Sequence, residues 1–165
     1  MTIEDDIKFL EEVPLLRHIG RAGLRILAIG AEQRYVHGGE ILFHKNTQAD
    51  SGYVIQEGSF NLSAGPDSGV RAYTAVPGTL LAEMALIAET DHGMTATAAE
   101  PSTVVRIPRS LFLKMLEGYP DAARRLRDHI VVRAEEAERD LAKIHAVMGG
   151  DPRRRGGETP RAAGR

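Results

Sequence analysis

The 165-residue chain contains no cysteine and no tryptophan, and aromatic residues make up only 5% of it. Without cysteine there is no disulfide, no thiolate nucleophile and no cysteine-ligated zinc or iron–sulfur site. Apolar residues amount to 42% and charged residues to 27%, which is ordinary for a globular domain. The core of that domain must therefore be mostly aliphatic.

Long hydrophobic runs and an excess of positive charge are also missing. No apolar run approaches the roughly 18 to 20 residues that span a bilayer, and the start MTIEDDIKF is acidic where a signal peptide is basic. We therefore expect a cytoplasmic protein without a membrane segment. The net charge is −2, and five arginines against two acids after Met148 leave the body at about −5. An acidic body argues against nucleic-acid binding.

Hydrophobic periodicity changes twice along the chain. Helical spacings between Ile3 and Ala31, broken by Pro14 and two glycines, predict two or three short helices. Short β-rich runs with turn signals then predict an antiparallel barrel or sandwich. The runs are Arg34–His37, Glu40–His44, Gly52–Gln56, Ser59–Ala64, Val70–Val76 and Thr103–Ile107. Within this region Leu80–Ala88 predicts one or two helical turns.

Helical patterns return after Pro108. Ser110–Glu117 predicts one helix, and Pro120 begins a long one that runs to about Val147. This long helix is either an amphipathic helix packed on its own barrel or, as we favour, the seam of a homodimer. The seam has heptad spacing at Ile130, Ala134, Ala137, Leu141, Ile144 and Met148. We expect residues 1–148 to form one domain and the Gly/Arg-rich residues 149–165 to be disordered.

The stretch Pro77–Ala98, called the cassette below, contains the most informative chemistry. A glycine turn leads into a short helix with Glu83 near its start, and His92 follows nine residues later. Free N–H groups at a helix start suit a phosphate, and a carboxylate accepts from sugar hydroxyls, so the pattern favours a small anion attached to a sugar. Glu83 has a simpler interpretation as a carboxylate that complements the helix dipole.

Two parts of the cassette, LAEMAL (81–86) and HGMTATA (92–98), resemble the phosphate-binding cassette of the cyclic-nucleotide-monophosphate-binding domains. The segments HGGEILF (37–43) and ADSGYVIQEGS (49–59) resemble the strand pairs of that family. The resemblance implies an antiparallel jelly-roll β-barrel (double-stranded β-helix) with N-terminal helices, a short internal cassette helix and a long C-terminal helix. It also implies a regulatory ligand-sensing module, not an enzyme, with cAMP or cGMP as possible ligand and no other cofactor.

By this resemblance, Glu83 holds the ribose 2′-hydroxyl, and the backbone around Ala82, Ala85 and Leu86 receives the phosphate. Ala82 replaces the usual glycine of the family, which adds a methyl group and makes a positive φ costly. Both this change and the one at His92, described next, weaken the expected affinity for an ordinary cyclic nucleotide.

His92 stands where the family has its phosphate-pairing arginine. Loss of one charge-assisted contact costs about 1.5 to 3 kcal/mol, or roughly ten- to a hundredfold in affinity. Three interpretations stay open for His92: a phosphate contact, an exposed loop histidine without a task, and a contact that strengthens on protonation. Gly93 occupies the position where a hydroxyl favours guanine, so cAMP is the better expectation than cGMP.

The sequence suggests three alternative functions. The first is a degenerate module without nucleotide binding that serves as a dimerising or protein-interaction scaffold. The second is metal catalysis through His37 and His44, which the sequence disfavours because the two residues are seven apart and no later strand supplies a histidine. The third is transcription regulation, but we expect no DNA-binding domain in this chain, because the residues after Met148 show no helical pattern.

Overall fold

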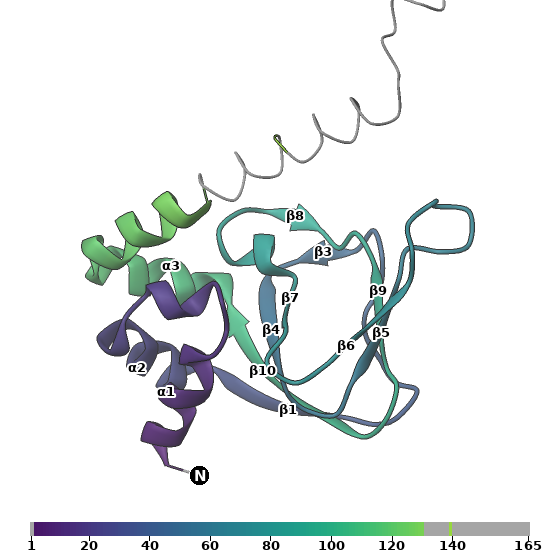
Figure 1. Ribbon diagram of the computed structural model, residues 1–165, viewed down its shortest axis with the longest axis horizontal. Helices are drawn as coiled ribbons and strands as arrows, with labels where there is room; N and C mark the ends of the chain where they lie inside the picture. Colours follow the sequence, from purple (N-terminus) through teal and green to yellow (C-terminus); the bar gives the residue numbers. More distant parts are fainter. Residues whose placement is uncertain (1, 131–138, 140–165) are drawn as a thin grey trace, which may run out of the picture. The chain divides into compact units, whose positions relative to one another are not determined.

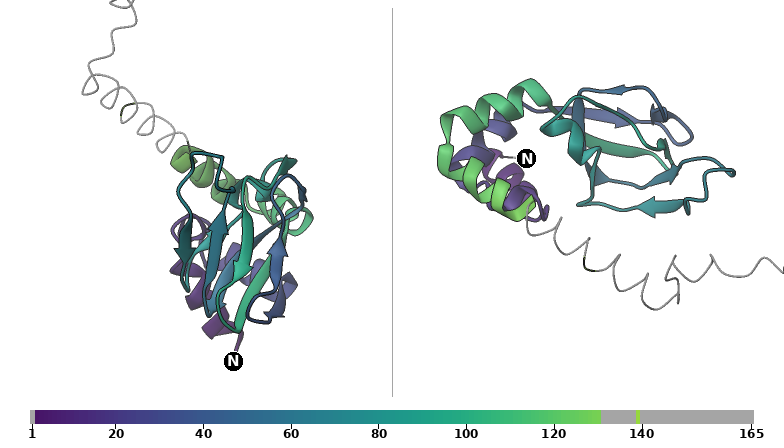
Figure 2. Two further views of the ribbon diagram at one scale, coloured as in Figure 1. Left: turned by 90° about the vertical axis from the view of Figure 1, so that its right-hand side faces the viewer. Right: turned by 90° about the horizontal axis from the view of Figure 1, so that it is seen from above.

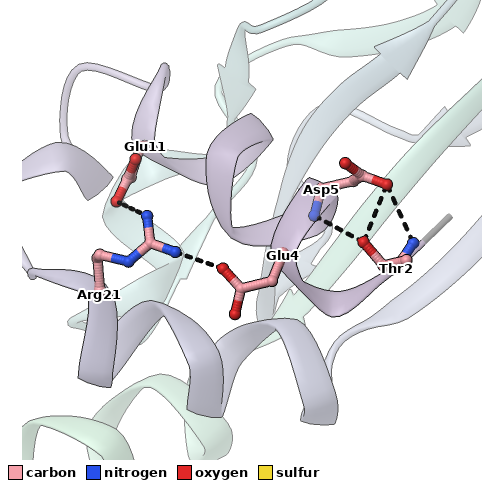
Figure 3. Close-up of polar contacts among 5 residues, drawn as sticks. All are labelled: Thr2, Glu4, Asp5, Glu11 and Arg21. Atoms are coloured by element: carbon pink, nitrogen blue, oxygen red, sulfur yellow. Dashed lines mark hydrogen bonds and ion pairs between the residues drawn. The ribbon is translucent and has the colours of Figure 1, made fainter.

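Three short helical segments open the chain in the computed structural model, which describes residues 2–130 and 139. They are α1 (Ile3–Glu11), the 3₁₀ turn η1 (Leu16–His18) and α2 (Arg21–Gly30), as the helical spacing predicts. Thr2 caps α1, because its hydroxyl accepts from the Asp5 N–H while the Asp5 carboxylate accepts from the Thr2 N–H (Figure 3). This capping box satisfies donors that the helix itself leaves unpaired.

Arg21, the first residue of α2, joins that helix to α1. Its guanidinium pairs with the carboxylates of Glu4 and Glu11 (Figure 3). All three side chains are at least one-third exposed, so each pair contributes at most about 1 kcal/mol. Burial of apolar side chains holds the helical segments together more strongly, and the fully buried ones include Ile7, Leu10, Leu16, Leu24 and Leu27.

Short antiparallel strands follow and build the barrel that Figures 1 and 2 show beside the helices. One sheet has the order β1–β10–β4–β7, the other has the order β2–β9–β5–β6, and β3 pairs with β8 in a separate ribbon. The strands are β1 (Glu32–Val36), β2 (Ile41–Phe43), β3 (Gln48–Ala49), β4 (Ser51–Glu57), β5 (Phe60–Ser63), β6 (Tyr73–Ala75), β7 (Leu80–Leu81), β8 (Thr90–Asp91), β9 (Thr95–Ala98) and β10 (Ser102–Pro108).

The barrel interior is filled by apolar side chains from both sheets. Strand β5 shows the pattern clearly, since Phe60 and Leu62 are buried while Asn61 and Ser63 are exposed. The barrel core consists of Val36, Leu42, Phe43, Tyr53, Ile55, Phe60, Leu62, Ala75, Leu81, Ala96, Ala98 and Val104. Most of these residues are aliphatic, as the composition requires.

Helix α3 (Arg109–Gly118) begins where β10 ends, and a further helical stretch covers residues 120–130. Met115 of α3 is buried against α2 beside Gly23, where an added Cβ would lie 3.1 Å from the Met115 sulfur. Arg125 connects the later stretch to η1, because its Nε and Nη2 donate to the carbonyls of His18 and Ile19 at 2.8 and 2.9 Å. The segments before and after the barrel thus pack together.

The predicted jelly-roll barrel with flanking helices is confirmed. The segment Leu80–Ala88 divides into strand β7 and a single 3₁₀ turn, η2 (Glu83–Leu86), so its helical part is one turn of four residues. Apart from Ile130, the predicted heptad positions lie outside the described residues, as does the predicted disordered tail. Among the helices that the structure describes, none combines the length and the apolar character that crossing a membrane demands.

Candidate functional site

The cassette turn begins with a strained residue. Ala82 follows β7 in the left-handed conformation, with φ 58° and ψ 43°, and η2 starts directly after it. A side chain with a Cβ is disfavoured in this region by about 1–2 kcal/mol. The sequence led us to expect that a positive φ at this position would be costly for alanine. The φ of Ala82 is indeed positive, so the chain adopts the left-handed conformation despite that cost.

Glu83 is the first residue of η2 and is half-buried. Ala85 and Leu86, at the other end of the turn, are fully buried. Leu86 lies directly on the backbone of β4, because a Cβ added at Gly52 would come within 3.0 Å of the Leu86 side chain. The buried pair therefore anchors the turn in the protein, and the carboxylate stands at its start.

The backbone donors around Ala85 are partly used within the turn. The N–H of Ala85 donates to the Ala82 carbonyl at 3.0 Å, and those of Ile87 and Ala88 donate to the Met84 carbonyl at 3.2 and 3.1 Å. Among the residues predicted to receive the phosphate, Ala85 therefore has a backbone N–H that already donates a hydrogen bond within the turn. The side chains of Ala85 and Leu86 serve to seat the turn.

His92 does not stand exposed on a loop. Its side chain is only 8% exposed and its ring stacks on that of Phe43, with centroids 3.8 Å apart and planes 7° apart. Phe43 in turn contacts Tyr53, at 5.8 Å between centroids. The backbone of His92 is also fixed, since its N–H donates to the Thr47 carbonyl and its carbonyl accepts from the Asn46 N–H. The interpretation of His92 as an exposed loop histidine is therefore wrong, because the residue is buried.

Burial lowers the pKa of His92 below its ordinary value of 6.5. The carboxylates of Asp50 and Asp91 act in the opposite direction but do not cancel this effect. The imidazole is therefore neutral at neutral pH. A neutral ring offers a phosphate at most one ordinary hydrogen bond, where an arginine offers a charged and bidentate one.

Gly93 is exposed, and a Cβ added there would meet nothing within 4 Å. The strand that precedes His92 and Gly93, β8, contacts both η2 and β3 at one end of the barrel (Figure 1). The fold thus brings together the two segments of the cassette that the sequence singled out. The ring of His92, however, packs onto Phe43 of β2.

Sequence reasoning missed Arg109. This residue stands at the junction of β10 and α3, and its Nη1 donates to the carbonyls of Ala49, Ala85 and Ala88 at 3.1, 3.3 and 2.9 Å. The only signal in the sequence is its place directly after Pro108, between a predicted strand and a predicted helix. Its acceptors are backbone atoms, which no side-chain motif reveals.

A cleft beside α1 and the surroundings of His37 lie apart from the contacts of the cassette described above. A cleft of about 300 Å³ lies between α1 and the outer face of the sheet that contains β1, β10 and β4, and no cassette residue lines it. His37 packs its ring edge-on against Tyr35, at 4.7 Å between centroids. Within residues 2–130 and 139 no group of three or more His, Asp or Glu side chains is arranged to hold a metal ion.

Comparison with known proteins finds similarity over the barrel. Residues 33–119, more than half of the chain, match the family described as cyclic nucleotide-binding domain, and this range includes the whole cassette. A cyclic nucleotide-binding-like protein from Brucella abortus is 38% identical with a TM-score of 0.61, and the similarity covers 68% of this chain and 98% of that one.

Two more distant relatives extend the comparison. The N-terminal domain of a transcriptional regulator from Streptomyces coelicolor has a TM-score of 0.72 at 21% identity, covering 81% of this chain and 94% of that one, and it shows the shared fold. An uncharacterized NTE family protein of Mycobacterium tuberculosis is 32% identical over 111 residues, which are 67% of this chain and 19% of that protein. The chain thus spans less than a fifth of the length of that relative.

Proposed function

Because this chain belongs to the cyclic nucleotide-binding domain family, we propose that it is a regulatory module whose cassette binds a cyclic nucleotide, cAMP in preference to cGMP. The family is described by the ligand class that it binds and not by a reaction that it catalyses. The proposed role accordingly contains no catalytic step. We place the protein in the cytoplasm, as a homodimer joined along the C-terminal helix.

The observation that carries this proposal is the left-handed backbone of Ala82. Strained conformations are retained where the surrounding structure enforces them, and they cluster at ligand sites. Here the strain holds the entry to η2 in a left-handed conformation that glycine adopts at little cost. A turn that had lost all contact with ligands would be free to relax to an unstrained shape.

The places of Glu83, His92 and Gly93 in the cassette support the following proposed contacts. Glu83, at the start of η2, accepts a hydrogen bond from the ribose 2′-hydroxyl. The phosphate lies near the turn and next to His92, whose neutral ring makes this a weaker contact than an arginine gives. Gly93 leaves open space and offers no hydroxyl to a guanine, which supports the preference for cAMP.

Signal output requires that the ligand bind two arrangements of the protein with different affinities. The turn η2 contacts α3, and α3 leads into the helical stretch 120–130. We propose that closure of η2 on the ligand shifts α3 and, through it, the C-terminal helix.

A titration tests the binding step. The full chain is heated with cAMP, cGMP or 5′-AMP at concentrations up to millimolar, and the affinity is measured by calorimetry. A ligand present at 100 times its Kd stabilises the protein by about 2.7 kcal/mol. We expect cAMP to raise the melting temperature most, cGMP less and 5′-AMP least. No rise with either cyclic nucleotide would contradict the proposal.

Variants of the cassette locate the contacts. Glu83→Gln should weaken cAMP binding by roughly tenfold or more, because a charge-assisted hydrogen bond is lost. The matched control is Glu89→Gln, which removes an exposed carboxylate a few residues away and should leave the affinity unchanged. His92→Arg should raise the affinity, and Gly93→Ser should move the preference toward cGMP. Equal losses from Glu83→Gln and Glu89→Gln would refute the assigned role of Glu83.

The stacking of His92 on Phe43 favours a second candidate function. A buried and neutral ring in place of the phosphate-pairing arginine suits a module that no longer binds nucleotides and instead serves as a scaffold for dimerisation or for a protein partner. The same titration separates the two candidates. A wild-type chain that ignores both cyclic nucleotides, together with a His92→Arg variant that binds cAMP, would indicate a decayed site.

A further inference from the structure

The side chain of Arg109, the first residue of α3, joins the cassette turn to that helix. The guanidinium of Arg109 donates through Nη1 to three backbone carbonyls, those of Ala49, Ala85 and Ala88. The N–H of Arg109 itself donates to the Asp50 carbonyl at 2.8 Å. A single residue therefore connects the end of β3, the end of η2 and the start of α3.

The acceptors of Arg109 explain why this residue is effective. Carbonyls at the end of a helical turn have no partner within the turn and carry partial negative charge. A guanidinium is always ionised, and its hydrogen bonds to such carbonyls are charge-assisted. Arg109 is half-buried, and its hydrogen bonds to the carbonyls of Ala49 and Ala85 are partly buried, so water competes less for these two carbonyls than it does at an exposed turn.

The turn that Arg109 holds is too short to hold itself. A 3₁₀ turn of four residues makes few internal hydrogen bonds and depends on its surroundings for its position. Leu86 provides an apolar anchor on Gly52 of β4, while Arg109 fixes the carbonyls of Ala85 and Ala88. Glu83 stands at the opposite end of the turn, so its placement depends on both anchors.

We infer that Arg109 is a positioning residue for the cassette, which sets the place of Glu83 and transmits movement of η2 directly to α3. The inference rests on the proposed function as far as the ligand is concerned. The coupling itself is a property of the unliganded protein. A merely structural role would instead stabilise the whole domain and have no particular effect on the cassette.

Hydrogen exchange of the unliganded full chain tests the coupling without any ligand. The amides of Ala85, Ile87 and Ala88 report on the turn, because each donates a hydrogen bond within it. In Arg109→Met these amides should exchange about tenfold faster or more, as expected for the loss of charge-assisted hydrogen bonds, while those of β10 keep their protection. Arg109→Lys, which retains the charge, should increase the exchange rates of these amides by a smaller factor. It is the test variant if Arg109→Met does not fold.

The matched control is Arg125→Met. It removes a guanidinium that also donates to two backbone carbonyls, those of His18 and Ile19, but away from the cassette. Its cassette amides should exchange as in the wild type. Unchanged cassette protection in both Arg109 variants, or a loss spread evenly over the barrel, would overturn the inference.

The ligand measurement is a separate arm. If the wild type binds cAMP, Arg109→Met should weaken that binding about tenfold or more, while its melting temperature falls no further than that of Arg125→Met. An unchanged affinity would overturn the positioning role and leave the proposed function intact. If the wild type binds no cyclic nucleotide, the proposed function fails, and the exchange experiment alone decides the coupling.

Discussion

Replacement of Ala82 by glycine should stabilise this protein, although glycine usually destabilises. Ala82 has φ 58° and ψ 43°, a conformation that costs a residue with a Cβ about 1–2 kcal/mol and costs glycine little. Against this, replacing alanine by glycine lowers the free energy of unfolding by about 0.4–1 kcal/mol, because the unfolded chain gains conformational freedom. The Ala82 methyl group is only partly buried against the barrel core, so its lost packing is small. We expect a net gain of about 0.5–1 kcal/mol for Ala82→Gly.

Urea denaturation at fixed pH measures this gain, and the melting temperature should rise by about 1–4 °C. The matched control is Asn46→Gly, because Asn46 has φ 66° and is the other residue besides glycine with positive φ in the described chain. Asparagine tolerates the left-handed conformation better than alanine does, so Asn46→Gly should stabilise the protein less than Ala82→Gly. If Ala82→Gly leaves the stability unchanged or lowers it, Ala82 is not strained and the argument for a retained ligand-binding turn loses its support.

Two further outcomes follow from the packing around the cassette. Gly52→Ala should destabilise by about 1–3 kcal/mol, because the added Cβ lies 3.0 Å from Leu86; Gly93→Ala, which meets nothing within 4 Å, should be close to neutral in the same urea titration. His92 should make the protein less stable as the pH falls. Burial lowers its pKa from 6.5 in the folded state, so the unfolded chain binds a proton more readily in the interval just below pH 6.5. Denaturation at pH 7.5 and at pH 5.5 should show this loss of stability in the wild type and a smaller loss in His92→Phe, which keeps a ring on Phe43. Equal losses in the two proteins would refute the assignment of the pH dependence to His92.

The barrel was predictable because its longer strands carry their own signal. β5 alternates buried and exposed residues, and glycine-rich turns separate the runs. The strands without a prediction are β9 (Thr95–Ala98), which has four residues, and β3, β7 and β8, which have only two each. Such strands exist only through their partners, as β3 does through β8, and no local pattern marks them.

The cassette was predictable in position but not in its side-chain arrangement. Glycine in the family at the position of Ala82 gave a reason to expect a positive φ. Nothing local indicated that His92 turns onto Phe43, because the contact joins residues from distant parts of the sequence. Arg109 was missed for a related reason, since it acts on backbone carbonyls that only the folded chain brings together.

The cassette combines a left-handed backbone at Ala82 with a neutral histidine where the family resemblance implies an arginine. The guanidinium groups of Arg106 and Arg109 are both engaged, the first with Glu32 and Asp50 and the second with backbone carbonyls. His92 is neutral when no ligand is bound. A phosphate that approached His92 would favour its protonated form and raise its pKa, because an opposite charge stabilises the imidazolium. Binding of an anion beside His92 therefore takes up a proton, and that coupling makes the affinity rise as the pH falls, whereas an arginine at the same position would give no such dependence.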